Sequence, residues 1–392
     1  YDKDWLTVDN NPSSPFYGRA YITTSRFVND LLGAYAESPI YLSWSDNGGL
    51  TWSRPKEISA SHPSCTTQTT GPAGDTSCDE DQFSYPEVAS DGTLYVHFLN
   101  AQNDAEWEVE NDFDEQIMVV VSKDGGQTFE GPYQAAQLED GFSDTPYSVI
   151  GSQTVWGHQI RWASAGNISV NPNNHLDVTV VWSDRGTANP NATDACIEAI
   201  PGDPPNYDPC NSGPSANTNV YFSRSLDGGK TWTGRTLYDG AAGHQWFPWA
   251  DHKSDGTLAV AWDEDLQPAG GTDPVNEDFA HVLRTTAGKV QLGPAEHVDI
   301  SVTHWAGQYV PESLWPRVCG PNGYSDPPVT NAEGKDCNQF HGDYTGLAVD
   351  SLDRVHVVWT GLNRLATSPQ IDFYTGQPHD GYAQDAMYAR RG

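Results

Sequence analysis

Short runs of alternating apolar and polar residues recur along the chain, and each run follows a tight-turn signal. Alternation with a period of two is typical of half-buried β-strands. Five such runs have closely similar surroundings: Arg19–Thr24, Thr93–Phe98, Asp177–Trp182, Thr257–Trp262 and Arg354–Trp359. A second strand-like run precedes each of them: Trp5–Val8, Tyr85–Ala89, Trp162–Val170, Phe247–Ala250 and Tyr344–Val349. The pattern predicts an all-β protein built from repeated units.

An eight-residue motif, Ser-x-Asp/Asn-Gly-Gly-x-Thr-aromatic, occurs three times. It spans residues 45–52, 122–129 and 225–232, and each copy follows the third strand-like run of its unit. Asp-Gly and Asn-Gly after a strand are strong hairpin signals, because glycine accepts a positive φ and the Asx side chain accepts N–H bonds. The motif therefore predicts a tight turn into a fourth strand, which begins with the aromatic residue.

Each unit thus contains an inner strand, a tight turn, a second strand, a long loop, a third strand, the repeated motif and a fourth strand. The units begin near residues 1, 82, 158, 244 and 338. Repeated four-stranded meanders are typical of β-propellers. We expect one propeller domain over residues 1–392, with five blades visible; the fifth unit stops after its third strand.

The repeated motif resembles the Asp box, or BNR repeat, of the sialidase-like β-propellers. The resemblance implies that these turns are structural and lie on the face away from an active site. It assigns structural roles to six residues of the motif: Asn47, Trp52, Asp124, Phe129, Asp227 and Trp232.

Closure of the ring poses a separate question, because the fifth unit lacks a fourth strand. Proteins that resemble this one commonly carry further blades upstream. We expect that an upstream segment or a partner chain completes the propeller, giving six or seven blades in total. The alternative is a five-bladed ring with a three-stranded last blade.

The two faces of the predicted propeller differ. Antiparallel strands place the short turns on one face and the long connections on the other. The long connections are Phe27–Pro39, Ser59–Asp81, Asn100–Asp114, Gln134–Gly157, Ser183–Asn217, Asp263–Asp278, Glu296–Asn338 and Gly361–Ala383. Long loops on a rigid scaffold are where binding sites are expected. All six cysteines lie in these loops, and local pairing is the simplest arrangement: Cys65 with Cys78, Cys196 with Cys210, and Cys319 with Cys337.

Composition narrows the function. The net charge of −33 argues against a nucleic acid or anionic lipid partner bound through a basic face. No apolar run is long enough to span a membrane. Three loop disulfides indicate an oxidising, extracellular location. The acidic loops are compatible with Ca²⁺, although no cofactor is required.

The resemblance also suggests catalytic residues. Sialidase-like enzymes clamp a substrate carboxylate with three arginines and use a tyrosine nucleophile with an aspartate acid/base. The corresponding candidates here are Arg26, Arg185, Arg364, Tyr344, Asp343 and Asp4. The Arg-Ile-Pro motif of sialidases is absent, since residues 18–20 read Gly-Arg-Ala. The alternative is that the arginines pair with nearby carboxylates and that Asp343 and Tyr344 serve blade packing.

Two classes of function therefore remain open. The first is a secreted exo-glycosidase or polysaccharide lyase, and the second is a non-catalytic propeller that binds glycan or protein or serves in extracellular assembly. Glutamine and histidine recur before the inner strands, and could line a central channel, bind metal or act as a lyase base, although a structural role comes first. They are Gln82, His158, Gln159, His244, Gln245, Gln339 and His341.

Overall fold

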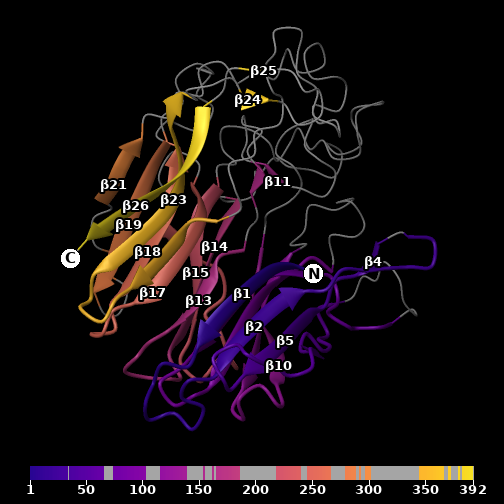
Figure 1. Cartoon of the computed structure of the whole chain (residues 1–392). Coiled ribbons are helices and arrows are strands. Elements are labelled where there is room, and N and C mark those ends of the chain that lie inside the picture. The colour runs from indigo at the N-terminus through magenta and orange to yellow at the C-terminus, as the bar shows by residue number, and fades with distance from the viewer. Residues whose placement is uncertain are drawn as a thin grey trace.

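The computed structural model describes about three fifths of the chain. The described residues are 1–33, 35–65, 74–102, 115–138, 153–154, 161–162, 165–185, 218–239, 245–265, 279–287, 291–292, 296–301, 344–365, 370–371, 378–379 and 382–391. Every regular element within these ranges is a β-strand, as the alternating pattern predicts (Figure 1).

Four sheets contain four or more strands, and a fifth contains three. The first is β1 (Asp2–Val8), β2 (Ala20–Ser25), β5 (Ile40–Ser45) and β6 (Lys56–Glu57). The second is β7 (Asp81–Val88), β8 (Leu94–Asn100), β9 (Gln116–Ser122) and β10 (Glu130–Gln137). The third is β13 (Asn167–Val170), β14 (Val178–Arg185), β15 (Thr218–Ser225) and β16 (Thr236–Asp239).

The C-terminal sheets are less regular. The fourth is β17 (Gln245–His252), β18 (Leu258–Asp265), β19 (Phe279–Ala287) and β20 (Gln291–Leu292), and β21 (Glu296–Ser301) also pairs with β19. The fifth is β22 (Gly346–Val349), β23 (Val355–Leu365) and β26 (Tyr382–Arg391). Three two-stranded sheets complete the set: β3 (Val28–Asn29) with β4 (Tyr35–Glu37), β11 (Gln153–Thr154) with β12 (Arg161–Trp162), and β24 (Gln370–Ile371) with β25 (Pro378–His379).

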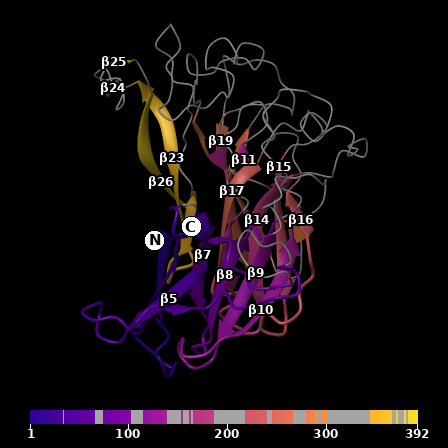
Figure 2. The same ribbon diagram turned by 90° about the vertical axis from the view of Figure 1, so that its right-hand side faces the viewer.

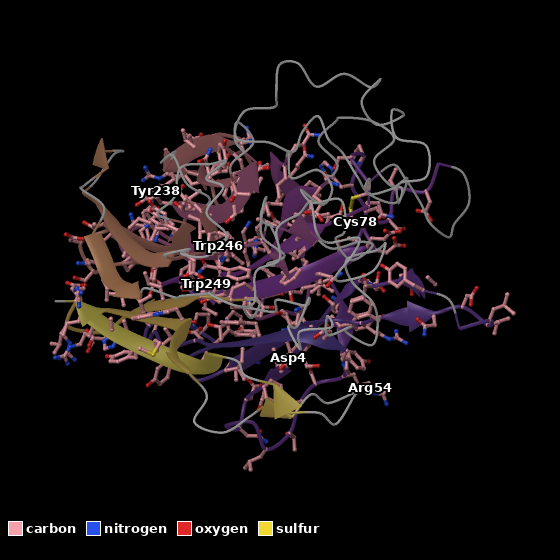
Figure 3. All side chains as sticks on the ribbon, turned by 90° about the horizontal axis from the view of Figure 1, so that it is seen from above. Asp4, Arg54, Cys78, Tyr238, Trp246 and Trp249 are labelled. Atoms are coloured by element: carbon pink, nitrogen blue, oxygen red, sulfur yellow. A yellow bond between two sulfur atoms is a disulfide. The ribbon has the colours of Figure 1, made fainter. Side chains whose placement is uncertain are left out.

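The sheets follow one another around a common centre, as the view from above shows (Figure 3). Their inner strands contact each other in chain order, from β1 through β7, β13 and β17 to β22. Within a sheet the strands succeed one another outward, as β7, β8, β9 and β10 do in Figure 2. The expected all-β, propeller-like arrangement is confirmed. The number of four-stranded blades is four rather than five, because the last sheet has three strands among the described residues.

Apolar side chains fill the space between successive sheets. Leu42 of the first sheet packs with Val96 and Met118 of the second. On the opposite face of the second sheet, Val119 packs with Ile168 and other residues of the third. Similar clusters join the third sheet to the fourth and the fourth to the fifth. A sheet that lies between two neighbouring sheets is therefore apolar on both faces. Its polar residues concentrate at the strand ends.

The three repeated motifs share one hydrogen-bond pattern. Asp124 Oδ1 accepts from the backbone N–H groups of Gln127 (3.0 Å) and Thr128 (2.8 Å). Ser122 Oγ donates to Asp124 and accepts from Gly126 N. Asp227 and Asn47 accept equivalent backbone bonds. The motif forms the predicted turn because a single Asx side chain satisfies donors that the turn leaves unpaired.

These turns also hold neighbouring sheets together. Arg19 donates to the carbonyl of Gly125 at 2.8 Å and forms an ion pair with Asp46 at 2.6 Å. Gly125 has a φ of 71°, and a Cβ atom there would lie 2.4 Å from Arg19 Nη1. Glycine is thus required both for the backbone conformation and for this close approach.

Hydrogen bonds also join the turns between the first and second strands of neighbouring sheets. Asn11 Nδ2 donates to the carbonyl of Ser90 in the second sheet, and Asn173 Nδ2 donates to that of Ser254 in the fourth at 2.8 Å. The backbone N of Ser254 in turn donates to Asp353 of the fifth sheet at 2.6 Å. The turn face is therefore a series of linked turns.

The long-loop face carries the disulfide between Cys65 and Cys78, which confirms that predicted pair. Cys65 Sγ lies 3.5 Å from Asn100 Oδ1 at the end of β8 and from Gln116 Nε2 at the start of β9. Asp124 follows the opposite end of β9. For the second blade the disulfide and the repeated turn thus lie on opposite faces, as predicted. Cys196, Cys210, Cys319 and Cys337 lie outside the described residues.

His97 of β8 is fully buried, opposite Tyr85 and Val119. Neither ring nitrogen has a hydrogen-bond partner among the described residues, and burial lowers the pKa of His97 to about 3. Since an unfolded histidine titrates near pH 6.5, the folded state releases a proton that the unfolded state binds. The contribution of neutral His97 to the free energy of unfolding is thus fully present above pH 6.5 and is lost as the pH falls toward 3.

We predict that His97→Val reduces this acid sensitivity. Valine occupies the matching register position of the third sheet, Val181 opposite Asn167. Between pH 8 and pH 5, the wild-type protein should lose about 2 kcal/mol more than the variant, since 1.5 pKa units correspond to that energy. Urea unfolding at both pH values measures the difference. His175→Asn, at a half-exposed histidine, is the control; parallel pH profiles for wild type and His97→Val would contradict the prediction.

Candidate functional site

Aromatic side chains from four sheets meet at the centre of the propeller. We call Trp5, Phe83, Tyr85, Trp249 and Tyr344 the axial aromatic cluster. Trp5 lies 4.8 Å from Trp249, 5.4 Å from Tyr85 and 5.6 Å from Tyr344, measured between ring centroids. Figure 3 shows Trp249 near the common centre of the sheets. The cluster fills the axis with apolar surface where the sequence suggested a polar channel.

The inner strands reach the centre through a repeated bulge. The register shifts between Asp2 and Trp5, between Gln82 and Tyr85, and between Trp246 and Trp249. The residue within each bulge has a positive φ although it is not glycine: Lys3 at 55°, Phe83 at 54° and Phe247 at 51°. Bulges re-aim side chains, and strained residues of this kind concentrate at functional sites. The site candidate is therefore the long-loop end of the inner strands.

Lys3 brings a positive charge to this end of the axis. Its ammonium group lies 4.8 Å from the Phe83 ring centroid and 5.6 Å from that of Tyr344. Tyr344 is partly buried, and its ring also contacts Phe83 at 6.0 Å. Asp4, next to Lys3 on β1, is exposed. A cation and aromatic faces thus meet at the mouth of the axis, and the exposed Asp4 is next to Lys3 on β1. We call these residues the axial mouth (Lys3, Asp4, Phe83 and Tyr344).

Two carboxyl groups lie on the inner strands beyond the axial aromatic cluster, toward the turn face. Asp251 accepts from the backbone N–H groups of Val349 (2.7 Å) and His252 (2.8 Å). Burial raises the pKa of Asp251 to about 6 despite these bonds. Burial, together with the nearby charge of Asp251, also raises the pKa of Glu87 well above its usual value. Acidic groups therefore lie on the turn-face side of the cluster.

Of the three predicted arginines, only Arg26 has a described side chain. Arg26 Nη1 donates to the hydroxyl of Tyr41 at 2.9 Å, and the guanidinium lies 5.2 Å from the Tyr41 ring centroid. Tyr41 in turn donates to Glu57 Oε2 at 3.2 Å. Arg26 is thus held within the first sheet, and no contact joins it to Tyr344 among the described residues.

The remaining predicted catalytic residues are placed only in part. Arg185 is the last residue of β14, and Arg364 lies on β23 opposite Ala383, but their side chains fall outside the described part of the structure. Asp343 also lies outside it. Tyr344 lies in the axial aromatic cluster, one residue beyond Asp343, and Asp4 follows Lys3. The catalytic roles of all six residues stay predictions.

Sequence reasoning missed a buried row of polar side chains across the second sheet. Asn100 Nδ2 donates to Asp81 Oδ1 at 2.7 Å, Gln116 Nε2 donates to Asn100 Oδ1 at 2.7 Å, and Gln134 Nε2 donates to Gln116 Oε1 at 2.6 Å. We call these four residues the amide row. Asp81, Asn100 and Gln116 lie at the long-loop ends of their strands, beside the disulfide, and Gln134 reaches them from within β10. Three amide or carboxyl residues at equivalent strand ends, Asp81, Asn100 and Gln116, are the sequence signal that could have predicted it.

The recurrent glutamines and histidines are mostly outside the described residues. Gln245 is fully buried, and its Oε1 accepts from the backbone N–H of Val220 in the third sheet at 3.4 Å. This contact is structural. Across the described ranges, no group of three or more His, Cys, Asp or Glu side chains is arranged to hold a metal ion. Ca²⁺ binding stays a prediction. The described ranges also contain no helix that is long and apolar enough to cross a membrane.

Comparisons with known proteins find solved structures at low sequence identity and with TM-scores below 0.5. No family model matches the sequence, and no curated protein matches it. A GH93 α-L-arabinofuranosidase of Fusarium graminearum is 12% identical with a TM-score of 0.45, covering 99% of this chain and 76% of that one. An α-L-arabinanase of Penicillium chrysogenum is 15% identical with a TM-score of 0.43, covering 90% and 87%. The NanB sialidase of Streptococcus pneumoniae is 12% identical with a TM-score of 0.37, covering 90% and 35%.

We predict that Asp81→Asn flattens the pH dependence of stability. Burial raises the pKa of Asp81 well above its usual value, more than the bonds from Ser59 and Asn100 lower it. A carboxyl with a raised pKa contributes stability at low pH that is lost as the pH rises toward its folded-state value. Asparagine keeps the side-chain oxygen that accepts the hydrogen bond from Asn100, but unlike the Asp81 carboxyl it cannot ionise.

Thermal unfolding between pH 4 and pH 8 measures the effect. The wild-type protein should lose stability relative to Asp81→Asn as the pH rises, and the variant should melt roughly 2 °C higher at pH 8. Asp30→Asn, at an exposed loop position, is the matched control. A difference between Asp81→Asn and wild type that is constant with pH would show that Asp81 is not the group responsible.

Proposed function

We propose that this chain is a carbohydrate-directed β-propeller that binds its ligand at the axial mouth. The observation that carries the proposal is the mutual contact of Lys3, Phe83 and Tyr344 at the long-loop end of the axis, with Asp4 next to Lys3 on β1. Ligand sites are concave and mainly apolar or aromatic, with a few convergent polar groups. Sugar rings offer both apolar C–H faces and hydroxyl groups, so they suit an aromatic surface flanked by an ammonium and a carboxylate.

Electrostatics restricts the ligand class. The net charge of −33 repels long polyanions, whereas Lys3 provides a local positive charge beside the aromatic rings. A neutral saccharide or one with a single carboxylate fits this balance best. The disulfide between Cys65 and Cys78 supports an extracellular location, where such ligands occur.

The finer proposal is an exo-glycosidase of sialidase type with Asp-box turns. Its support is the common hydrogen-bond pattern of the three repeated turns and the position of Tyr344 at the axial mouth. In this mechanism Tyr344 is the nucleophile, Asp343 or Asp4 the acid/base, and Arg26, Arg185 and Arg364 the carboxylate clamp. The bond from Arg26 to Tyr41 favours the second candidate, a binding propeller without catalysis, because it engages one of the three clamp residues elsewhere.

The test combines a hydrolysis assay with a glycan array. Fluorogenic sialosides and α-L-arabinofuranosides are included because sialidases and arabinofuranosidases are among the similar structures. If the chain is a glycosidase, Tyr344→Phe should lower kcat on the order of 10³-fold or more while ligand binding persists. Tyr17→Phe, at an exposed tyrosine of the turn face, is the control.

The outcomes separate the two candidates. Glycan binding without hydrolysis, weakened by Lys3→Met but not by Tyr17→Phe, supports the binding propeller. Absence of both hydrolysis and glycan binding, in protein with an intact thermal transition, would reject the carbohydrate proposal as a whole.

A further inference from the structure

The first of the three repeated turns carries asparagine where the other two carry aspartate. Asn47 lies at the position of Asp124 and Asp227 in the motif, and Gly48 follows it. All three turns belong to the described residues, and Asn47 and Gly48 are exposed. The first turn therefore has an amide group in place of a carboxylate, at a position that water reaches.

The oxygen of the Asn47 amide makes the bonds of a carboxylate oxygen. Asn47 Oδ1 accepts from the backbone N–H of Thr51 at 2.9 Å and from the hydroxyl of Ser45 at 3.0 Å. In the third turn, Asp227 Oδ1 accepts from the two equivalent donors at 2.9 and 2.8 Å. Two donors aimed at a carbonyl oxygen stabilise the negative charge that develops on it when a nucleophile adds to its carbon.

The nitrogen of the same amide does not match the other turns. Asn47 Nδ2 donates to the Thr51 hydroxyl at 2.8 Å. In the third turn the direction is reversed, because the Thr231 hydroxyl donates to Asp227 Oδ2 at 2.6 Å, and the second turn has the same bond. An oxygen in place of Asn47 Nδ2 would give all three turns one hydrogen-bond pattern.

Glycine after Asn47 leaves the neighbouring backbone nitrogen accessible. Gly48 has a φ of 69°, and apart from the adjoining residues no atom lies within 4 Å of the place that a Cβ atom would take. In the third turn the equivalent Gly228 N–H donates to the carbonyl of Leu176 at 3.0 Å, whereas the Gly48 N–H has no such bond among the described residues. Attack of the Gly48 nitrogen on Cγ of Asn47 closes a small ring that contains atoms of these two residues alone.

We propose that Asn47 is a deamidation site that the turn itself converts to aspartate. The Gly48 nitrogen loses its proton to water and bonds to Cγ of Asn47, and the Cγ–Nδ2 bond breaks as Nδ2 takes up a proton and leaves as ammonia. Water then adds to Cγ, the bond between Cγ and the Gly48 nitrogen breaks, and that nitrogen regains a proton. The net reaction consumes water and releases ammonia, and nothing is oxidised or reduced.

Two residues of the turn assist this reaction. The Thr51 N–H and the Ser45 hydroxyl hold Oδ1 while it carries negative charge. The Thr51 hydroxyl lies beside the departing nitrogen, where a rotation of its O–H bond passes a proton to it. In the ring intermediate the donors to Oδ1 still polarise Cγ. Water therefore adds at Cγ and gives aspartate, whereas addition at the backbone carbonyl carbon would give isoaspartate.

The product fits the turn in which it forms. A carboxylate at this position accepts the bonds that Asp227 accepts, and bonds to a charged acceptor are stronger than bonds to an amide. The new charge lies next to Asp46, whose ion pair with Arg19 belongs to the contacts between the first and second sheets. We therefore expect the processed turn to be at least as stable as the original one.

Peptide mapping by mass spectrometry follows the reaction in the 392-residue protein during prolonged incubation at neutral pH. We expect Asn47 to convert in the folded protein at least as fast as in a synthetic peptide of residues 43–53, with aspartate as the main product. Asn29 and Asn173 are exposed asparagines that no glycine follows. They are internal controls and should stay unconverted over the same period.

Variants of Thr51 test the part that the turn plays. Thr51→Val removes the hydroxyl beside Nδ2 and should slow the conversion roughly fivefold, the effect of losing one ordinary hydrogen bond. Thr51→Ser restores a hydroxyl and should recover most of the rate. Thr128→Val, at the equivalent position of the second turn, is the matched control and should leave the rate at Asn47 unchanged. Thermal unfolding shows whether each variant is folded.

Four results would overturn the proposal. Faster conversion in the peptide than in the folded protein would show that the turn protects Asn47. An excess of isoaspartate, or equal rates for folded Thr51→Val and Thr51→Ser, would show that the turn does not direct the reaction. A lower unfolding temperature for Asn47→Asp than for wild type would show that the product does not fit. None of these measurements involves a ligand at the axial mouth, so failure here is distinguishable from failure of the carbohydrate proposal.

Discussion

Face-to-face packing between successive sheets is the constraint on which the structure depends. A strand such as β8 is buried along its whole length, with Val96 and Phe98 against the first sheet and Tyr95 and Leu99 against the third. A sheet with two apolar faces is stable only between two neighbours, since exposed apolar surface is unfavourable. Apart from buried exceptions such as His97, polar residues therefore concentrate at the strand ends, which is why both faces of the propeller are polar.

The two faces then serve different purposes. On the turn face, side chains such as Arg19 and Asn173 join neighbouring sheets through backbone carbonyls. On the long-loop face, the bulges at Lys3 and Phe83 turn side chains toward the axis. The axial aromatic cluster closes the centre, so a ligand at the axial mouth would rest on aromatic rings rather than enter a channel.

The local features of this fold could be predicted from the sequence because their causes are local. The Asx-Gly-Gly turns follow from one side chain that satisfies nearby N–H groups, and the pairing of Cys65 with Cys78 follows from their proximity within one loop. The alternation of the strands predicted the units and the two faces.

The features that sequence reasoning missed depend on contacts between distant segments. The positive φ at Phe83 has no signal in the sequence, because the residues around it favour a regular strand. The amide row needs four strands in one register. The bond from Arg26 to Tyr41 depends on the pairing of β2 with β5. A candidate site assembled from such residues becomes visible only when the strands are placed beside each other.

The linked turns have a consequence for how the molecule would come apart. Each interior sheet is tied to two neighbours, through bonds such as that from Asn11 to Ser90 on one side and from Asn173 to Ser254 further round. Among the described residues, such turn-face bonds join the first and fifth sheets to one neighbour each, whereas at the axis Trp5 of the first sheet contacts Tyr344 beside the fifth. Loss of order on the turn face would therefore start at these two sheets, as in a repeat array where each repeat is stabilised mainly by its neighbours, while the axial aromatic cluster still joins them.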